Sequence, residues 1–250
     1  MYYVKMTFTP SNKINITENN IEDDIITGRI WNYLGNMSRY GQIFKDMTLI
    51  YEKNVFHAFF LMPEIDSLDE KNCHRHTVDA LADVRKKFGI STEILGSNSV
   101  VSEVCMCDDP SWYVLYGRRD YAFSPIVCGD CLKMIPAYKF LHIELPLDCP
   151  SEFGWLEDYC MINQLWFRSS FDRFTYRQMN DPESQLSKSG RKICAFFEKE
   201  TKKPYYYHLF HYSDSKKNRG LCPDCGGNWI LKESIGSITY KCDKCRLVSS

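Results

Sequence analysis

The feature that most constrains the fold is a pair of cysteine corners near the end of the chain. Cys222 and Cys225 form one C-x2-C corner, and after sixteen intervening residues Cys242 and Cys245 form another. Two corners separated by about 15 to 20 residues can present four thiolates to one tetrahedral Zn²⁺ ion. The sequence therefore predicts a zinc ribbon over residues 219–250, with these four cysteines as structural ligands.

The residues between the two corners support this prediction. Gly226 and Gly227 allow the chain to turn tightly after the first corner. Residues 229–231 and 238–240 are rich in β-forming side chains and predict two strands of a hairpin around residues 234–236.

A second cysteine group lies in the middle of the chain. Cys105 and Cys107 form a C-x-C corner, and after twenty intervening residues Cys128 and Cys131 form a C-x2-C corner around Gly129. Both corners can direct two sulfurs to one ion, although C-x-C is the less usual spacing. We expect a second structural zinc and therefore two Zn²⁺ ions per chain; the alternative is a set of free thiols.

Composition predicts a globular protein, because 44% of the 250 residues are hydrophobic. The start of the chain lacks the features of a signal peptide, and no apolar run is long enough to cross a bilayer. We expect a cytoplasmic location without membrane attachment. Eight of the twelve cysteines fall in close pairs, and without an export signal metal binding explains them better than disulfides.

The net charge of -1 conceals an asymmetry along the chain. Residues 185–250 carry 13 Lys and Arg against 6 Asp and Glu, a net +7, which leaves 18 against 26, a net -8, for the rest. Four thiolates around one Zn²⁺ carry -2 themselves, so the basic excess of the C-terminal part falls to about +5 when the metal is bound. This is a modest electrostatic footprint for nucleic-acid binding.

The first hundred residues predict a ferredoxin-like βαββαβ domain over residues 1–98, within an α+β protein. A capping box at Ser67 to Glu70 indicates the start of the second helix, with Val78, Leu81, Val84 and Phe88 as its apolar stripe. The expected elements are strands at 2–9, 48–51, 55–62 and 90–95, a helix carrying Ile26, Ile30, Leu34 and Met37, and a helix ending at Gly89.

Residues 99–218 predict an α+β region that contains the second cysteine group and two helices. The first helix follows Ser151, and the second has Asp181 and Pro182 as its N-cap and first residue. Short strands are expected at 112–116, 138–143 and 205–212, and the polar segment 213–219 is the expected linker to the ribbon.

Catalytic interpretations have little support. A catalytic zinc keeps an open coordination position, whereas both cysteine groups are complete with four sulfurs. Cys73, His74 and His76 fall together on the predicted second helix, where partly buried structure explains them better than a metal site. The chain lacks a Walker loop and the usual nucleotide, esterase and metalloprotease motifs. We therefore expect a protein that is not an enzyme, with no catalytic residue.

The basic C-terminal part supplies candidate nucleic-acid contacts. Lysines and arginines would contact phosphates, and two aromatic rings would stack on bases. A solvated basic face, with the tryptophan packed over the zinc corner, explains the same residues equally well. The candidates are Lys216, Lys217, Arg219, Trp229, Lys232, Tyr240, Lys241, Lys244 and Arg246.

The C-terminal half resembles a bacterial protein family of unknown function that is described as zinc-ribbon-containing and nucleic-acid-binding. The resemblance covers residues 100–250 and implies a cytoplasmic bacterial zinc protein with Cys222, Cys225, Cys242 and Cys245 as ligands. The segments that carry it are 128–131, 177–182, 186–187, 190–191, 203–207 and 241–247.

Two functions from different classes remain open. The first is a non-enzymatic zinc-ribbon protein that binds DNA or RNA through its basic C-terminal region. The second is a protein-binding module, either an adaptor or an immunity protein that neutralises a toxin. Acidic residues such as Asp108 and Asp109, together with those in segment 18–24, could face a basic protein partner.

Overall fold

The computed structural model describes residues 1–11, 27–97, 104–117, 124–143, 145–146, 149–210 and 220–250. These residues form two compact units. The N-terminal unit comprises residues 1–104 and 136–142, and the C-terminal unit comprises residues 105–135 and 143–250. Each unit has its own sheet.

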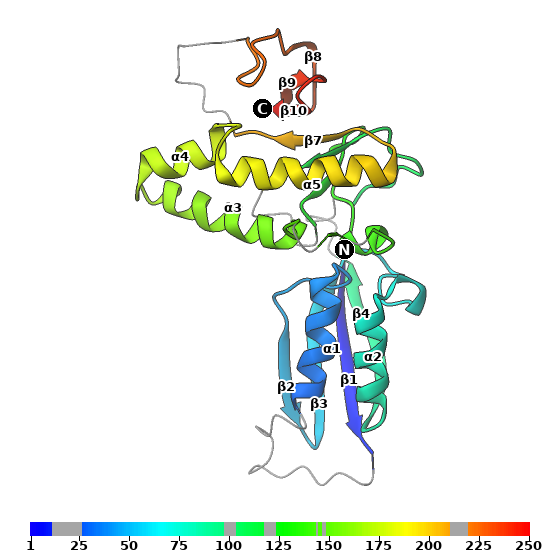
Figure 1. The fold of residues 1–250 in the computed structure, drawn as a ribbon. Helices are drawn as coiled ribbons and strands as arrows, with labels where there is room; N and C mark the ends of the chain where they lie inside the picture. Colours follow the sequence, from blue (N-terminus) through cyan, green and yellow to red (C-terminus); the bar gives the residue numbers. More distant parts are fainter. Residues whose placement is uncertain (12–26, 98–103, 118–123, 144, 147–148, 211–219) are drawn as a thin grey trace. The chain divides into compact units, whose positions relative to one another are not determined.

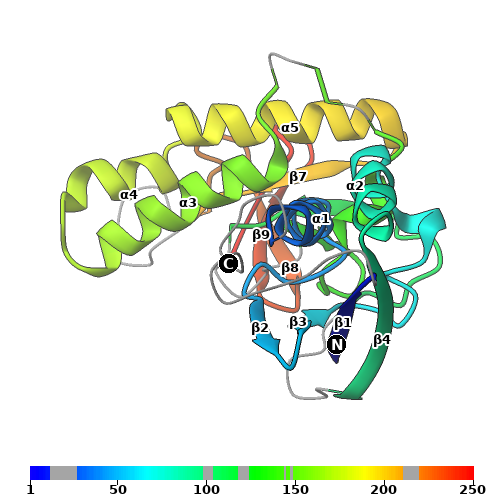
Figure 2. The ribbon, with the colours of Figure 1, turned by 90° about the horizontal axis from the view of Figure 1, so that it is seen from below.

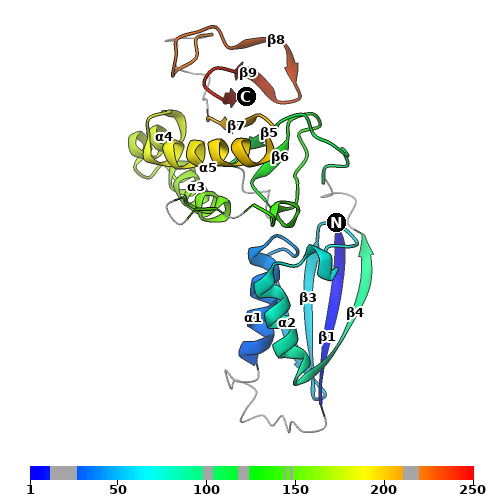
Figure 3. The same ribbon diagram turned by 45° about the vertical axis from the view of Figure 1, so that its right-hand side comes forward.

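The N-terminal unit is a four-stranded antiparallel sheet with its two helices on one face (Figures 1 and 3). The strand order β2-β3-β1-β4 is that of the ferredoxin-like fold, so the predicted βαββαβ order is confirmed. Its elements are β1 (Tyr2–Pro10), α1 (Thr27–Arg39), β2 (Thr48–Glu52), β3 (Val55–Met62), α2 (Arg75–Arg85) and β4 (Phe88–Ser97).

Alternation along the two central strands builds the core of this unit. Residues 4, 6 and 8 of β1 and the even-numbered residues of β3 are buried under the helices, while their odd-numbered neighbours are partly exposed on the other face. The helix α1 contributes Ile30, Leu34 and Met37 to the same core. Ile26, which was expected on this helix, lies outside the described residues.

The second helix begins later than the capping box predicts. The Ser67 hydroxyl donates to the Glu64 carbonyl at 2.7 Å, and a short 3-10 helix, η1 (Glu70–Asn72), follows. The helix α2 is capped by His74, whose Nδ1 accepts from the His76 N–H at 3.2 Å. Cys73 therefore lies before the helix, and Phe88 belongs to β4.

The C-terminal unit has a six-stranded mixed sheet, in the order β6-β5-β7-β10-β9-β8. The pairs β5–β7 and β7–β10 are parallel, and the other pairs are antiparallel. The elements are β5 (Tyr113–Leu115), β6 (Ile126–Cys128), α3 (Glu152–Phe167), α4 (Asp172–Asn180), α5 (Gln185–Thr201), β7 (Tyr205–His208), β8 (Ile230–Ile235), β9 (Ile238–Cys242) and β10 (Leu247–Ser249).

The predicted cysteine hairpin is present as β8 and β9, with Ile235 opposite Ile238 across the turn. It does not stand apart from the rest of the unit, because β10 pairs with β9 on one side and with β7 on the other. Leu247 and Val248 in β10 are fully buried. The cysteine hairpin and the middle of the chain therefore share one sheet.

In the described residues of the C-terminal unit, three α-helices precede this hairpin where two were expected. The structure adds α4, which forms a helical hairpin with α3 beside α5 (Figures 1 and 2). The helix α5 is capped by Ser184, whose hydroxyl accepts from the Ser187 N–H at 3.1 Å. The predicted cap, Asp181, instead accepts from the Glu183 N–H at 2.9 Å.

Of two further predicted elements, the strand at 138–143 was wrong and the linker at 213–219 lies outside the described residues. The strand expected at 138–143 is instead a 3-10 helix, η2 (Ala137–Phe140), in the N-terminal unit. The hydroxyl of Tyr138 and the ammonium of Lys139 both contact the Glu64 carboxylate, and these contacts hold the segment in place. The expected linker 213–219 lies outside the described residues.

Candidate metal centres and a basic cleft

The central cysteine site brings together Cys105, Cys107, Cys128 and Cys131. Their sulfurs all lie within 4.8 Å of one another, and those of Cys105 and Cys131 are 3.5 Å apart. Four sulfurs bound tetrahedrally at about 2.3 Å from one ion lie about 3.8 Å from each other. The geometry therefore fits a single metal ion.

The C-terminal cysteine site, formed by Cys222, Cys225, Cys242 and Cys245, meets the same test. Its sulfurs also lie within 4.8 Å of one another, and those of Cys225 and Cys242 are 3.7 Å apart. The first corner precedes β8 and the second begins at Cys242, the last residue of β9, so the hairpin brings the two corners together. Both predicted ligand sets are thus assembled in a form compatible with two bound metal ions.

The three C-x2-C corners share one backbone turn. In each, the residue four positions after the first cysteine has a left-handed conformation: Gly226 (φ 69°), Leu132 (φ 55°) and Arg246 (φ 53°). Gly226 donates to the Cys222 carbonyl at 2.9 Å and Leu132 to the Cys128 carbonyl at 2.8 Å. Glycine adopts this conformation readily, whereas the other two residues are held there at some conformational cost.

Gly129 has a different role from the one its position suggests. Its φ is not positive; instead, a methyl group at this position would overlap the ring of Trp112. The Gly129 N–H also donates to the Trp112 carbonyl at 2.8 Å. Gly129 is therefore needed because an indole ring lies directly against the corner.

The thiols within each site ionise differently. Burial raises the pKa of Cys128 to about 11 and also raises the pKa of Cys105. In the C-terminal site, the backbone N–H of Gly227 and the neighbouring thiols lower the pKa of Cys225 to about 7, while burial raises the pKa of Cys245. A bound cation stabilises all four thiolates, so loading a site releases protons.

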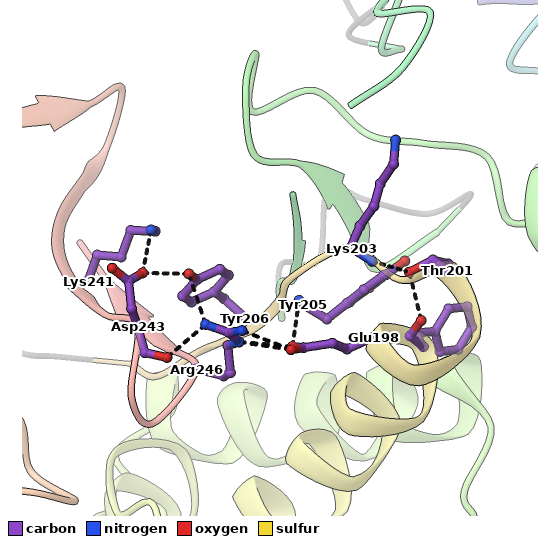
Figure 4. A network of polar contacts seen from close by, with 9 residues as sticks. Glu198, Thr201, Lys203, Tyr205, Tyr206, Lys241, Asp243 and Arg246 are labelled. Atoms are coloured by element: carbon purple, nitrogen blue, oxygen red, sulfur yellow. Dashed lines mark hydrogen bonds and ion pairs between the residues drawn. The ribbon is translucent and has the colours of Figure 1, made fainter. Parts of the chain in front are cut away.

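A network of polar contacts fixes the second C-terminal corner to α5 and β7 (Figure 4). The guanidinium of Arg246 makes a two-pronged contact with Glu198, through Nε and Nη2 at 2.9 Å each. Asp243 accepts from the Tyr206 hydroxyl at 2.5 Å and from the Lys241 ammonium at 2.6 Å. The hydrogen bonds from Arg246 hold the pKa of Glu198 below its ordinary value.

A cleft of about 840 Å³ lies between α5 and the C-terminal cysteine site. Asp224 and Glu198 in its wall are engaged by Arg191, at 2.6 Å, and by Arg246. With two acidic residues against six basic ones, the lining carries a net charge of +4. The basic residues are Lys188, Arg191, Lys192, Lys199, Lys244 and Arg246.

Four of these basic residues were not among the predicted contacts. Lys188, Arg191, Lys192 and Lys199 come from α5, at positions that fall on one face of the helix. Arg191, Lys192 and Lys199 follow Lys188 by three, four and eleven residues, a spacing that indicates one face of a helix in the sequence alone. This basic face was not predicted, because the helix was recognised only from its apolar stripe of Leu186, Ile193 and Phe197.

The predicted nucleic-acid contacts do not form one surface. Lys244 and Arg246 line the cleft, while Lys241 lies over the rings of Tyr206, at 4.6 Å, and Trp112, at 5.1 Å. Trp229 is 3% exposed and packs on Tyr240 with ring centres 5.1 Å apart. Lys232 is exposed on β8. Lys216, Lys217 and Arg219 lie outside the described residues.

The fold and the two sites define a two-unit α+β protein with a pair of four-cysteine centres in its C-terminal unit. No helix within the described residues is both long and apolar enough to span a membrane. Residues 107–210 match a family model described as "Domain of unknown function (DUF2310)", and residues 209–250 match "Domain of unknown function (DUF8594)".

Two relatives from Haemophilus influenzae are both named "Uncharacterized protein". One is 31% identical over 264 residues, a match that spans 100% of this chain and 98% of the relative. The other is 34% identical over 164 residues, a match that spans 63% of this chain and 80% of the relative. The chain therefore belongs to the same bacterial family of uncharacterised proteins. The predicted membership of a bacterial family of unknown function is confirmed, whereas the zinc ribbon and nucleic-acid binding implied by the resemblance stay predictions.

Among solved structures, the chain is similar to one described as "Crystal structure of antibiotic biosynthesis monooxygenase". The match covers 39% of this chain and 99% of that chain, with 12% identity and a TM-score of 0.30. A likeness this weak supports no inference about activity.

Proposed function

We propose that this protein is a non-enzymatic, zinc-stabilised protein that binds nucleic acid through the basic cleft of its C-terminal unit. The observation that carries the proposal is the cleft itself, in which six basic side chains surround an open volume of about 840 Å³. Phosphate contacts from lysine and arginine supply most of the affinity of sequence-independent nucleic-acid binding.

Zinc is the metal that best suits the two cysteine sites. Four cysteine sulfurs in a tetrahedral arrangement are characteristic of structural zinc, although iron can use the same donors. Four protein ligands leave no position for a substrate or an activated water molecule. The sites therefore support a structural role for the metal ions. We accordingly propose that the protein is not an enzyme.

The charge of the cleft remains favourable when the metal is present. A Zn²⁺ ion with four thiolates carries -2, which reduces the net charge of the lining from +4 to about +2. Lys188, Lys192 and Lys199 are exposed along α5, and Lys244 faces them from the cysteine corner. Eleven residues of helix extend about 16 Å, enough to contact more than one phosphate.

Salt-dependent binding tests this proposal. Fluorescence anisotropy would measure the Kd for 20-nucleotide single-stranded RNA and DNA between 50 and 300 mM NaCl. The variant Lys192→Gln/Lys199→Gln/Lys244→Gln should lower the slope of log K against log salt by about 2, since each lost contact to a single strand removes about 0.7. The matched control is Lys53→Gln/Lys86→Gln/Lys87→Gln, which neutralises three exposed lysines of the N-terminal unit. Equal slopes for the two variants would contradict the proposal.

A protein-binding role is the second candidate, and one feature favours it. Phe167, Phe171 and Phe174, at the connection between α3 and α4, are 84%, 75% and 58% exposed. Exposed aromatic side chains of this size are common in protein interfaces. Asp109, a predicted acidic contact, is engaged by Lys203, and the acidic segment 18–24 lies outside the described residues.

Purification from native cells separates the two candidates. Raised absorbance at 260 nm supports the nucleic-acid proposal, whereas a stoichiometric protein such as a toxin supports an adaptor or an immunity protein. We also propose a cytoplasmic location, because all twelve cysteines are free thiols and reducing compartments preserve them.

A further inference from the structure

The N-terminal unit contains a pocket of about 280 Å³ between its helices and its sheet. Most of the wall comes from α2 and β4, and the rest comes from α1, β1 and the segment that leads into η1. Figure 3 shows α1 and α2 side by side on the face of the sheet to which the pocket belongs. Every residue of the wall lies in the N-terminal unit, so this pocket is separate from the basic cleft.

The greater part of the pocket wall is apolar. Met6, Leu81 and Phe88 are at most 6% exposed, and Leu68 and Ile90 are partly buried beside them. An apolar cavity of about 150 Å³ is large enough to bind benzene. The pocket therefore has room for an apolar ring with a short substituent.

One buried polar group of the wall has no partner. Tyr33 is 4% exposed, and its hydroxyl makes no hydrogen bond within the described part of the chain. Its oxygen nevertheless remains accessible, as a place in the pocket wall requires. A buried hydroxyl without a partner is costly, so a pocket of this kind normally takes up a group that completes the hydrogen bond.

The Tyr33 hydroxyl can act as a hydrogen-bond donor. Burial raises the pKa of Tyr33, and the negative charges of Cys73 and Glu70 act in the same direction, although Arg85 opposes them. The hydroxyl therefore keeps its proton. An oxygen acceptor on a ligand is the group that it lacks.

The charged side chains of the wall offset each other. Arg85 donates through Nη1 to the Glu70 carboxylate at 2.9 Å, and both side chains are more than half exposed. The other described residues of the wall are uncharged, so the pocket as a whole is neutral. Transfer of an ion from water into such a pocket is unfavourable, whereas a neutral molecule enters without that cost.

We propose that this pocket binds a small neutral molecule, an apolar ring or short chain with one carbonyl oxygen that accepts a hydrogen bond from the Tyr33 hydroxyl. The apolar wall supplies most of the affinity, and the hydroxyl fixes the orientation of the ligand. The site does not depend on the proposed function, because the cleft and its metal-site wall contribute no residue to it.

Acetophenone tests the inference, because it combines a phenyl ring with one carbonyl group. An NMR titration of the full-length, unaltered chain should give saturable shifts with a Kd of about 1 mM or below. Intermolecular NOEs should connect acetophenone with the methyl groups of Met6, Leu81 and Ile90. The absence of saturable shifts at about 10 mM acetophenone, or NOEs confined to the C-terminal unit, would refute the inference.

The variant Tyr33→Phe tests the hydrogen bond. It should bind acetophenone about 5-fold more weakly than the wild type, and it should bind ethylbenzene, which has no acceptor, equally well. The matched control Tyr51→Phe removes a hydroxyl of the same unit that donates to Asn54 outside the pocket, and its affinity for acetophenone should be unchanged. Equal affinities of the two variants for acetophenone, or an equal loss for both probes in Tyr33→Phe, would contradict the proposed hydrogen bond.

Benzoate separates a neutral ligand from an anion. It is similar in size to acetophenone but charged at pH 7, so it should bind the wild type at least about 5-fold more weakly than acetophenone does. Tighter binding of benzoate would overturn the assignment of a neutral ligand. Failure of the protein to bind RNA or DNA would count against the proposed function and would leave these expected results unchanged.

Discussion

The helix α5 crosses β7 at Gly190, where the backbone of the helix approaches two fixed aromatic rings. Trp155 is 1% exposed, and its indole N–H donates to the Leu186 carbonyl at 3.1 Å. Tyr207 is fully buried, with its hydroxyl 3.4 Å from that of Ser187. Replacing Gly190 with Ala would put a methyl carbon on the Tyr207 ring and 2.8 Å from the Trp155 nitrogen.

The structure determines whether Gly190→Ala stabilises or destabilises the C-terminal unit, and by how much. Overpacking a well-packed core costs about 1–3 kcal/mol, and here both rings are buried. Alanine regains up to about 1 kcal/mol of helix preference over glycine. We therefore expect Gly190→Ala to destabilise the C-terminal unit by about 1–2 kcal/mol, which lowers its Tm by about 3–6 °C.

Gly35→Ala in α1 is the matched control. A methyl group at Gly35 meets no atom within 4 Å, so the same substitution in a helix should stabilise the N-terminal unit by up to about 1 kcal/mol. Urea unfolding in zinc-containing buffer would be followed by tryptophan fluorescence. Trp31 lies in the N-terminal unit, and the other four tryptophans lie in the C-terminal unit.

Separate probes are needed because the two units can unfold independently. Far-ultraviolet circular dichroism would report both transitions, and fluorescence mainly that of the C-terminal unit. A Gly190→Ala protein that unfolds at the same or a higher urea concentration than the wild type would refute the close approach of α5 to β7.

Two other predictions concern the metal sites and the contact between Arg246 and Glu198. Metal analysis should find two zinc ions per chain, with Cys128→Ser or Gly129→Ala removing the central ion and Cys222→Ser the other; one ion in the wild type, unchanged by Cys128→Ser, would exclude a central zinc site. Because Arg246 lowers the pKa of Glu198, the wild type should be more stable than Glu198→Gln above the ordinary glutamate pKa of about 4.3, and this advantage should vanish as pH falls through the lowered pKa. A Tm difference that stays constant from pH 7 to pH 3 would show that this carboxylate is not stabilised by the contact.

Much of the fold was predictable because its signals are local. Alternation in β1 and β3 and helical spacing in α1 give the ferredoxin-like order without tertiary information. The capping box at Ser67 predicted the helix start wrongly. The Ser67 hydroxyl donates to the Glu64 carbonyl in a local turn, and such a turn competes with helix capping. The helix α4 was missed because its first residues follow a left-handed Phe171, which no sequence rule anticipates.

The candidate site was predictable in its ligands and not in its surroundings. Cysteine spacing identifies both four-sulfur sets, because the chemistry of the metal fixes the spacing. The cleft depends on the pairing of β10 with β7, which brings Lys244 opposite Lys192 although 52 positions separate them in the sequence. The same part of the unit also places Lys241 over the Tyr206 ring and joins Arg246, in the wall of the cleft, to Glu198.

The position of β10 also determines how the cysteine hairpin is joined to the rest of the C-terminal unit. This strand of three residues lies inside the sheet, between β7 and β9, yet it follows every other strand in the sequence. The cysteine hairpin is thus joined to β7 through β10 alone among the pairings of the described strands. A chain truncated before Leu247 would keep both sets of metal ligands while losing the strand that links the cysteine hairpin to β7.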